Sequence, residues 1–147
     1  MVELLELVAL VAAALFAGAA LYINVAEHPA RSLLDAQSAV AQWAPSYHRA
    51  TWMQVPLALA SAAAGIAVWL IVGEVAWLAG AVLIGAVVPF TFIGVMPTNR
   101  LLLAIHAKRS ADDDARALLA RWNRLHAVRT LLSLGATALY AWLVVRT

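Results

Sequence analysis

Four long apolar stretches dominate the pattern of hydrophobic and polar positions along this chain. They cover residues 7–26, 53–72, 75–97 and 127–145, and each is about 19 to 23 residues long. A helix that crosses ~30 Å of hydrocarbon needs roughly 20 residues at 1.5 Å per residue. The pattern therefore predicts an all-α membrane protein, in which residues 1–147 form a single domain built as a bundle of four transmembrane helices.

The amino-acid composition supports a membrane protein. The chain is 65% hydrophobic and 12% charged, whereas a soluble domain carries about 25% charged residues. Because the sequence contains no cysteine, disulfides, thiolate nucleophiles and iron–sulfur ligation are excluded. The first apolar stretch follows Glu3 and Glu6 instead of Lys or Arg, so we expect a retained helix and not a cleaved signal peptide.

Prolines suggest where the first two spans end and begin. Pro29 disfavours helical geometry at the residue before it, so the first helix is expected to end at Glu27 or His28. Residues 31–43 then predict a short amphipathic helix along the membrane interface, in the first connection. Pro45 suits the first turn of the second helix.

The rest of the chain shows three further signals. Gly73 and Glu74 predict a tight turn between the second and third spans. Pro56 and Pro89 lie inside their spans and predict kinks. Acidic residues 112–114 precede apolar positions at helical spacing. The fourth helix is therefore expected to begin in the cytoplasm and to continue into the membrane.

Nine of the ten basic residues lie in or beside the first and third connections. The positive-inside rule places these connections in the cytoplasm and both termini outside it. We therefore expect an integral protein of the bacterial inner (plasma) membrane, with the lipid bilayer as its main partner. The basic connections meet an anionic leaflet, so the positive charge requires no nucleic acid. A chain this small also allows a homo-oligomer.

Polar side chains gather at the helix ends that are expected to share the cytoplasmic face. The fourth helix carries a stripe at spacings of three and four, formed by Asn123, His126, Thr130, Ser133, Thr137 and Tyr140. The other three helices contribute Asn24, Glu27, His28, Tyr47, His48, Thr51, Gln54, Thr91, Thr98 and Asn99. Polar groups at membrane depth are costly and usually face the bundle interior.

Structural roles are open for many of these residues. Ser and Thr in spans often form hydrogen bonds between helices, and Glu27 with Arg129 would form an ion pair between the first and fourth helices. His126 lies on the stripe, and three histidines with one carboxylate occupy convergent helix ends. Such clustered titratable groups favour a functional site.

The chain resembles the anthrone oxygenase family over nearly its whole length, and three segments carry the resemblance. They are residues 17–31, 88–102 and 121–134, with Glu-His-Pro-Ala, Pro-Thr-Asn and Trp-x-x-Leu-His-x-x-Arg as the specific elements. The resemblance implies a small four-helix membrane enzyme that oxygenates a polycyclic anthrone to an anthraquinone without a cofactor. It maps this activity onto Glu27, His28, Asn99, Trp122, His126 and Arg129.

The residue types suit that reaction. Removal of a proton from the methylene opposite the carbonyl of an anthrone gives an electron-rich anion that reduces O₂ directly, so no metal or flavin is strictly required. His126 or His28 is the expected base, and Asn99 and Arg129 are expected to stabilise the enolate oxygen. Trp122 is expected to stack on a flat lipophilic aromatic ketone or phenol. Glu27 is expected either to orient a histidine or to balance the charge of Arg129. Further contacts with the substrate are expected from Asn24, Thr130 and Gln54.

Two alternatives remain open at this stage. One is an oxidoreductase with a metal or haem held by His28, His48, His126 and Glu27, a ligand set that iron, copper or zinc accepts. The other is a non-catalytic membrane subunit or a binding protein for a lipophilic compound, in which proline kinks open a cavity between the helices.

Overall fold

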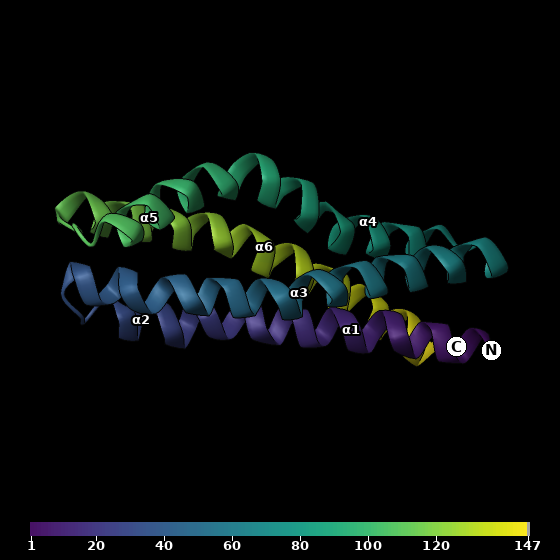
Figure 1. Ribbon diagram of the computed structural model, residues 1–147. Coiled ribbons are helices and arrows are strands. Elements are labelled where there is room, and N and C mark those ends of the chain that lie inside the picture. The colour runs from purple at the N-terminus through teal and green to yellow at the C-terminus, as the bar shows by residue number, and fades with distance from the viewer. Residues whose placement is uncertain (147) are drawn as a thin grey trace.

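The computed structural model describes residues 1–146, which form four long helical rods that run up and down the molecule (Figure 1). The rods comprise α1 (Val2–Tyr22), η1 (Ile23–Glu27) and α2 (His28–Arg31); α3 (Ala36–Val72); α4 (Val75–Phe90), η2 (Thr91–Val95) and α5 (Met96–Lys108); and α6 (Asp113–Arg146). The segments η1 and η2 are π-helical. Each rod is long and apolar enough to cross a membrane. The predicted all-α bundle of four spans is confirmed, and the chain is an integral membrane protein.

The two ends of the bundle differ. Both termini and the turn between α3 and α4 lie at one end, here called the terminal end (Figure 1). The connections 32–35 and 109–112 lie at the opposite end, here called the polar end. α1 and α4 each pack between α3 and α6. The rods therefore follow the order α1, α3, α4, α6 around the bundle, and all four bring residues to the polar end.

The expectation that the first helix ends at Glu27 or His28 is wrong, because the rod continues as α2 to Arg31. A proline in a helix lacks the N–H donor, and its ring collides with the carbonyl four residues earlier. η1 ends two residues before Pro29, and the wider turn of a π-helix accommodates that mismatch. η2 stands in the same relation to Pro97, and the third rod likewise continues, as α5, to Lys108.

The separate interfacial helix predicted for residues 31–43 is also absent as an independent element. Residues from Ala36 onward are the first turns of α3, which runs through Pro45 and Pro56 without interruption. Asp35 caps α3 by accepting a hydrogen bond from the Ser38 N–H at 3.0 Å. Hydrogen bonding from the Ser38 hydroxyl, and then from the Ser38 N–H, holds the pKa of the Asp35 carboxyl below its usual value.

Two other predicted features are confirmed. The chain turns tightly after α3, where Gly73 has φ 75° and its N–H donates to the Trp69 carbonyl at 2.8 Å. The fourth helix begins at Asp113, outside the apolar stretch, and the Ala115 N–H donates to the Asp112 carbonyl at 3.1 Å. Because the third rod extends beyond its predicted end to Lys108, only residues 109–112 connect α5 and α6.

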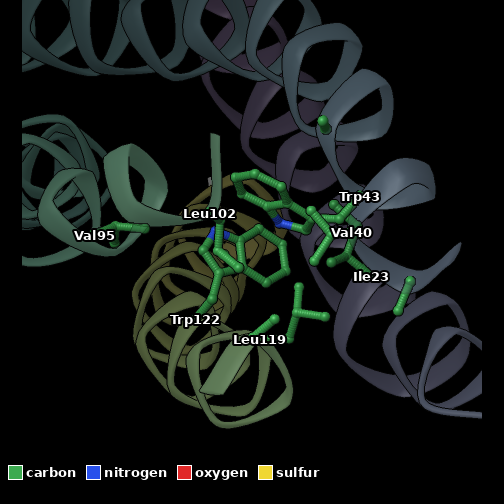
Figure 2. Packing of buried hydrophobic residues seen from close by; sticks show 10 residues of the cluster. Ile23, Val40, Trp43, Val95, Leu102, Leu119 and Trp122 are labelled. Atoms are coloured by element: carbon green, nitrogen blue, oxygen red, sulfur yellow. The ribbon is translucent and has the colours of Figure 1, made fainter. Parts of the chain in front are cut away.

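Aromatic packing fixes the rods at both ends. At the polar end, Trp43 of α3 meets Trp122 of α6 edge to face, with ring centroids 5.8 Å apart, within the apolar cluster of Figure 2. At the terminal end, Tyr140 stacks on Trp77 at 5.2 Å. Gly80 makes that close approach possible, because a Cβ there would overlap the Tyr140 ring. The polar end is thus held by buried side chains from α3 and α6.

Candidate functional site

Asn24 is the centre of a hydrogen-bonded cluster that joins the first rod to the fourth. It lies in η1, and its Nδ2 donates to the carbonyl oxygen of Asn123 at 3.0 Å and to the Asn123 Oδ1 at 2.7 Å. Its Oδ1 accepts from the Thr130 hydroxyl at 2.6 Å and lies 3.1 Å from Nδ1 of His126. One amide therefore pairs groups that would be costly to leave unsatisfied inside a membrane bundle.

These contacts determine which nitrogen of His126 carries a proton. A backbone carbonyl only accepts hydrogen bonds, so the Asn24 atom that faces Asn123 must be the amide nitrogen. The Asn24 oxygen is then an acceptor, and Nδ1 of His126 must donate to it. In the neutral imidazole, Nε2 is left with a free lone pair. Within residues 1–146, this nitrogen has no hydrogen-bond partner.

Glu27 belongs to a second network, formed with Arg31, Gln42 and Ser46. Its Oε1 accepts from the Arg31 guanidinium, from the Ser46 hydroxyl and from Gln42 Nε2 at 3.2 Å. The side chain of Arg31 is only 2% exposed. The expected pairing of Glu27 with Arg129 is therefore wrong. Continuation of the helix through Pro29 places Arg31 one turn after Glu27, at the spacing that favours an ion pair.

Arg129 is left without an acidic partner in the described part of the chain. Its Nη2 donates to Gln54 Oε1 at 2.8 Å, and its guanidinium lies 5.6 Å from the centre of the Phe16 ring. The ion pairs found within residues 1–146 are Glu27 with Arg31 and Glu74 with Arg146. A cation in this position favours an anionic ligand, because burial without a counter-charge is costly.

The two networks and Arg129 meet around a small polar cavity at the polar end. It offers about 10 Å³ of free space, which is roughly enough for one water molecule. Its walls are formed by Ile23, Arg31, Trp43, Ser46, Tyr47, Ala50, Thr51, Gln54, Trp122, His126 and Arg129. Trp122 is 4% exposed, and its ring lies 5.0 Å from that of His126. It therefore packs beside the cavity and is not at an open rim.

A larger apolar cavity of about 110 Å³ adjoins the polar one. Tyr47, Thr51 and Arg129 line both cavities. The other walls are apolar apart from Thr91, and comprise Phe16, Val55, Ala58, Val87, Val88, Phe92 and Met96. Arg129 is thus the charged group at the boundary between the apolar cavity and the polar cavity that His126 lines.

The structure brings together six of the residues selected from the sequence and separates the others. Those that meet at the polar cavity or in the cluster beside it are Asn24, Gln54, Trp122, His126, Arg129 and Thr130. His28 instead lines a separate hollow of about 90 Å³ with Arg31 and Arg116. Asn99 is completely buried in α5, and its side chain has no hydrogen-bond partner within residues 1–146.

The metal ligand set considered from the sequence does not assemble in this fold. Within residues 1–146, no three or more His, Cys, Asp or Glu side chains come close enough to hold a metal ion. Glu27 is engaged by its three donors, and His48 packs its ring 5.1 Å from that of Tyr47. His28, His48, His126 and Glu27 therefore remain apart.

Sequence reasoning missed two polar residues of the site, Arg31 and Ser46, which line the polar cavity. Asn24 was expected to touch substrate and not to orient His126. The spacing of Glu27 and Arg31 was a signal for their ion pair. That signal was lost because the first helix was expected to end before Arg31, which was assigned to a separate helix.

Comparison with known proteins identifies the family of the chain. The profile of the anthrone oxygenase family matches residues 43–139, a range that holds Gln54, His126 and Arg129 and begins after Asn24 and Glu27. Over 56 residues the chain is 43% identical to the anthrone oxygenase tpcL of Aspergillus fumigatus, an alignment that covers 37% of this chain and 35% of the fungal protein. No solved structure matches the chain. Because the family profile extends over well more than half of its residues, the chain belongs to the anthrone oxygenase family.

Proposed function

We propose that this protein is a membrane-embedded oxidoreductase that oxygenates a flat lipophilic aromatic ketone or phenol, with Nε2 of His126 as the base. The observation that carries the proposal is the fixed tautomer of His126. Oδ1 of Asn24 accepts a hydrogen bond from Nδ1–H of His126, with 3.1 Å between the two atoms, so the lone pair of Nε2 is free to take a proton from a substrate. Asn24 acts as a positioning residue, because it reaches the substrate through His126.

The reaction balances with O₂ as the only oxidant. For an anthrone, His126 removes a proton from the methylene carbon, and the resulting carbanion delocalises onto the carbonyl oxygen as an enolate. Transfer of electrons from this carbon to O₂ and formation of a carbon–oxygen bond give a peroxide, which takes up a proton. Loss of water from the hydroperoxide then leaves the anthraquinone. One anthrone and one O₂ thus yield one quinone and one water.

Arg129 is suited to stabilise the enolate oxygen. Its guanidinium lines the same cavity as His126 and has no acidic partner within residues 1–146. Gln54 orients it through the 2.8 Å hydrogen bond to Nη2. A preorganised cation at the point where negative charge develops lowers the barrier to deprotonation, and its effect is larger in a site that excludes water.

Replacement of His126 by alanine tests the proposal. Wild-type protein in lipid nanodiscs should consume O₂ and form anthraquinone from anthrone faster than empty nanodiscs do. His126→Ala should lower this rate by roughly 10² to 10⁴, the usual contribution of a general base. Ser133→Ala is the matched control, because the Ser133 hydroxyl lies on the same helix face and donates only to the Thr130 carbonyl.

Three outcomes would contradict the proposal. Wild-type turnover by His126→Ala would remove this residue from the chemistry. Activity that is lost on chelation and restored by one particular metal would favour metal-dependent oxidation. Failure of the folded wild-type protein to oxidise anthrone, 2-naphthol or a quinol above the rate in empty nanodiscs would favour a non-catalytic binding role.

A further inference from the structure

We propose that the apolar cavity accepts one ring of a lipid-dissolved aromatic compound end-on, with its acidic oxygen at Arg129 and the rest of the molecule in the bilayer. The inference deepens the proposed function, on which it rests, because it specifies how a substrate reaches His126 and which of its parts are recognised. It depends on the volume of the cavity, on the charge at its inner end and on the residues at its outer side.

The volume limits what the cavity can enclose. It offers about 110 Å³, and an apolar cavity of about 150 Å³ is the size that binds benzene in a protein core. One aromatic ring therefore fills the space between Phe16, Ala58 and Val87. A compound with two or three fused rings must leave its remaining rings outside the bundle.

The charge gives the inserted ring a direction. Arg129 is the one charged residue that lines the apolar cavity, and it has no acidic partner within residues 1–146. An ionised or enolised oxygen on the leading ring would supply the missing counter-charge, and hydrogen bonds between charged partners are about twice as strong as neutral ones. A ring that enters with its oxygen first also approaches the polar cavity, which His126 lines.

The outer side of the cavity faces lipid. Val55 of α3 is 41% exposed and Phe92 of η2 is 65% exposed, and both line the cavity. The third rod bows away from α3 in this region (Figure 1). Residues next to the opening are also exposed and apolar, including Met53 at 49% and Ile93 at 79%. A hydrophobic surface of this kind suits contact with hydrocarbon, so the compound enters sideways from the membrane.

This geometry predicts uneven selectivity along the substrate. Groups that flank the acidic oxygen enter the cavity and must fit between close-packed walls. Groups on the distant ring remain in lipid and meet no protein. The site should therefore discriminate strongly near the oxygen and tolerate long extensions at the opposite end of the molecule.

Four naphthalene probes test the selectivity, each measured by binding to protein-containing nanodiscs after subtraction of binding to empty nanodiscs. Relative to 2-naphthoate, 6-hexyl-2-naphthoate should bind within about threefold, whereas 1,3-dimethyl-2-naphthoate should bind at least about tenfold more weakly. Methyl 2-naphthoate, which lacks the charge, should also bind at least about tenfold more weakly. Arg129→Gln should abolish the preference for 2-naphthoate over its methyl ester.

Substitutions at the opening test the route. Val55→Trp should block the cavity mouth and weaken 2-naphthoate binding about tenfold. Val11→Trp, which changes an exposed valine on α1 away from the cavity, should leave this binding unchanged. Ala58→Leu fills the cavity from within and should have the same effect as Val55→Trp. Thermal unfolding of each variant identifies any that has lost its fold, and either of the two cavity variants suffices for the test.

The outcomes separate this inference from the proposed function. Equal binding by Val55→Trp, Ala58→Leu and Val11→Trp would overturn insertion into the cavity, even if anthrone turnover continued in the same nanodiscs. Equal weakening by the hexyl group and by the flanking methyl groups would overturn end-on binding. The expected binding pattern without oxygenation of anthrone would leave the site intact and refute the oxygenase activity instead.

Discussion

The two arginines that line the polar cavity differ in whether a carboxylate balances their charge. Arg31 is almost fully buried and is matched by Glu27, whereas Arg129 is held by the neutral oxygen of Gln54. Arg31 thus has a structural environment, with a carboxylate one turn away and the Trp122 ring 5.9 Å from its guanidinium carbon. Arg129 has the environment of a binding group, because its charge lies at a cavity wall without compensation.

Removal of one partner from the Glu27 and Arg31 pair should therefore destabilise the protein strongly. We expect Glu27→Gln to lower the free energy of unfolding by about 3 kcal/mol, because it leaves a buried guanidinium without its counter-charge. The double variant Glu27→Gln/Arg31→Met should recover much of this loss. Unfolding by denaturing detergent measures both effects.

Glu74 offers a matched control for that comparison. Its ion pair with Arg146 is 35% to 39% exposed, so Glu74→Gln should cost at most about 1 kcal/mol. If Glu27→Gln costs no more than Glu74→Gln, the pair at the polar end is not structural.

Helical spacing alone identified the interior face of α6, and His126, Thr130 and Ser133 are indeed buried. Gln54 was selected because it lies at the polar end of the second span, and Arg129, on α6 itself, was selected from the family resemblance. Spacing did not reveal that Asn24 contacts His126, since a contact between residues of two different helices depends on the rotation of each rod about its own axis. That rotation follows from η1, for which the sequence gives no periodic signal.

At the scale of elements, the π-helical segments determine how the rods reach the site. η1 and η2 each precede an X-Pro pair, and each turns a predicted helix end into a continuous helix. A π-helical turn holds one residue more than an α-helical turn. η1 uses this extra residue to present Asn24 to α6 and Glu27 to α3. The rule that a residue before proline ends a helix failed here, because His28 keeps α-helical backbone angles, φ −66° and ψ −44°, and the chain continues as α2.

Deletion of one residue provides a test of the extra residue in η2. Ile93 is 79% exposed, and its removal should convert η2 to an α-helical turn without rotating the helices on either side. We expect a folded protein whose melting temperature falls by about 5 to 10 °C. Deletion of Val82, which is 59% exposed within α4, should instead rotate every later residue of the rod by about 100° and prevent folding. Equal damage by both deletions would contradict this account.

At the scale of the whole molecule, the four spans followed from hydrophobic length, and the meeting of their polar ends followed from polar residues at alternate ends of consecutive spans. The connections followed only in part: the extension of α6 beyond the hydrocarbon was expected from its acidic start, whereas the extensions of the first rod, α3 and α5 were not. The basic residues that suggested long loops lie largely on α5 and on the first turns of α6. Their bias toward one end of the bundle persists, so the orientation expected from the sequence stays a prediction.

Reporter fusions measure that orientation. A reporter that works only outside the cytoplasm should be active when it is joined after Arg146. A reporter that works only in the cytoplasm should be active when it is inserted between Arg109 and Asp112, because basic residues concentrate at the polar end. A cytoplasmic C-terminus would reverse the protein and place the polar cavity at the outer face.

The length of α3 makes the thickness of the lipid layer part of the site's environment. Its 37 residues span about 55 Å, whereas the hydrocarbon is ~30 Å deep. Because the chain turns at Gly73, the apolar half of α3 occupies that depth, and Gln54 lies near the boundary with the headgroups. A thicker bilayer would surround Arg129 and His126 with acyl chains, and a thinner one would leave them among phosphates and water. Acyl-chain length would then change the solvation of the polar cavity without any change in the protein.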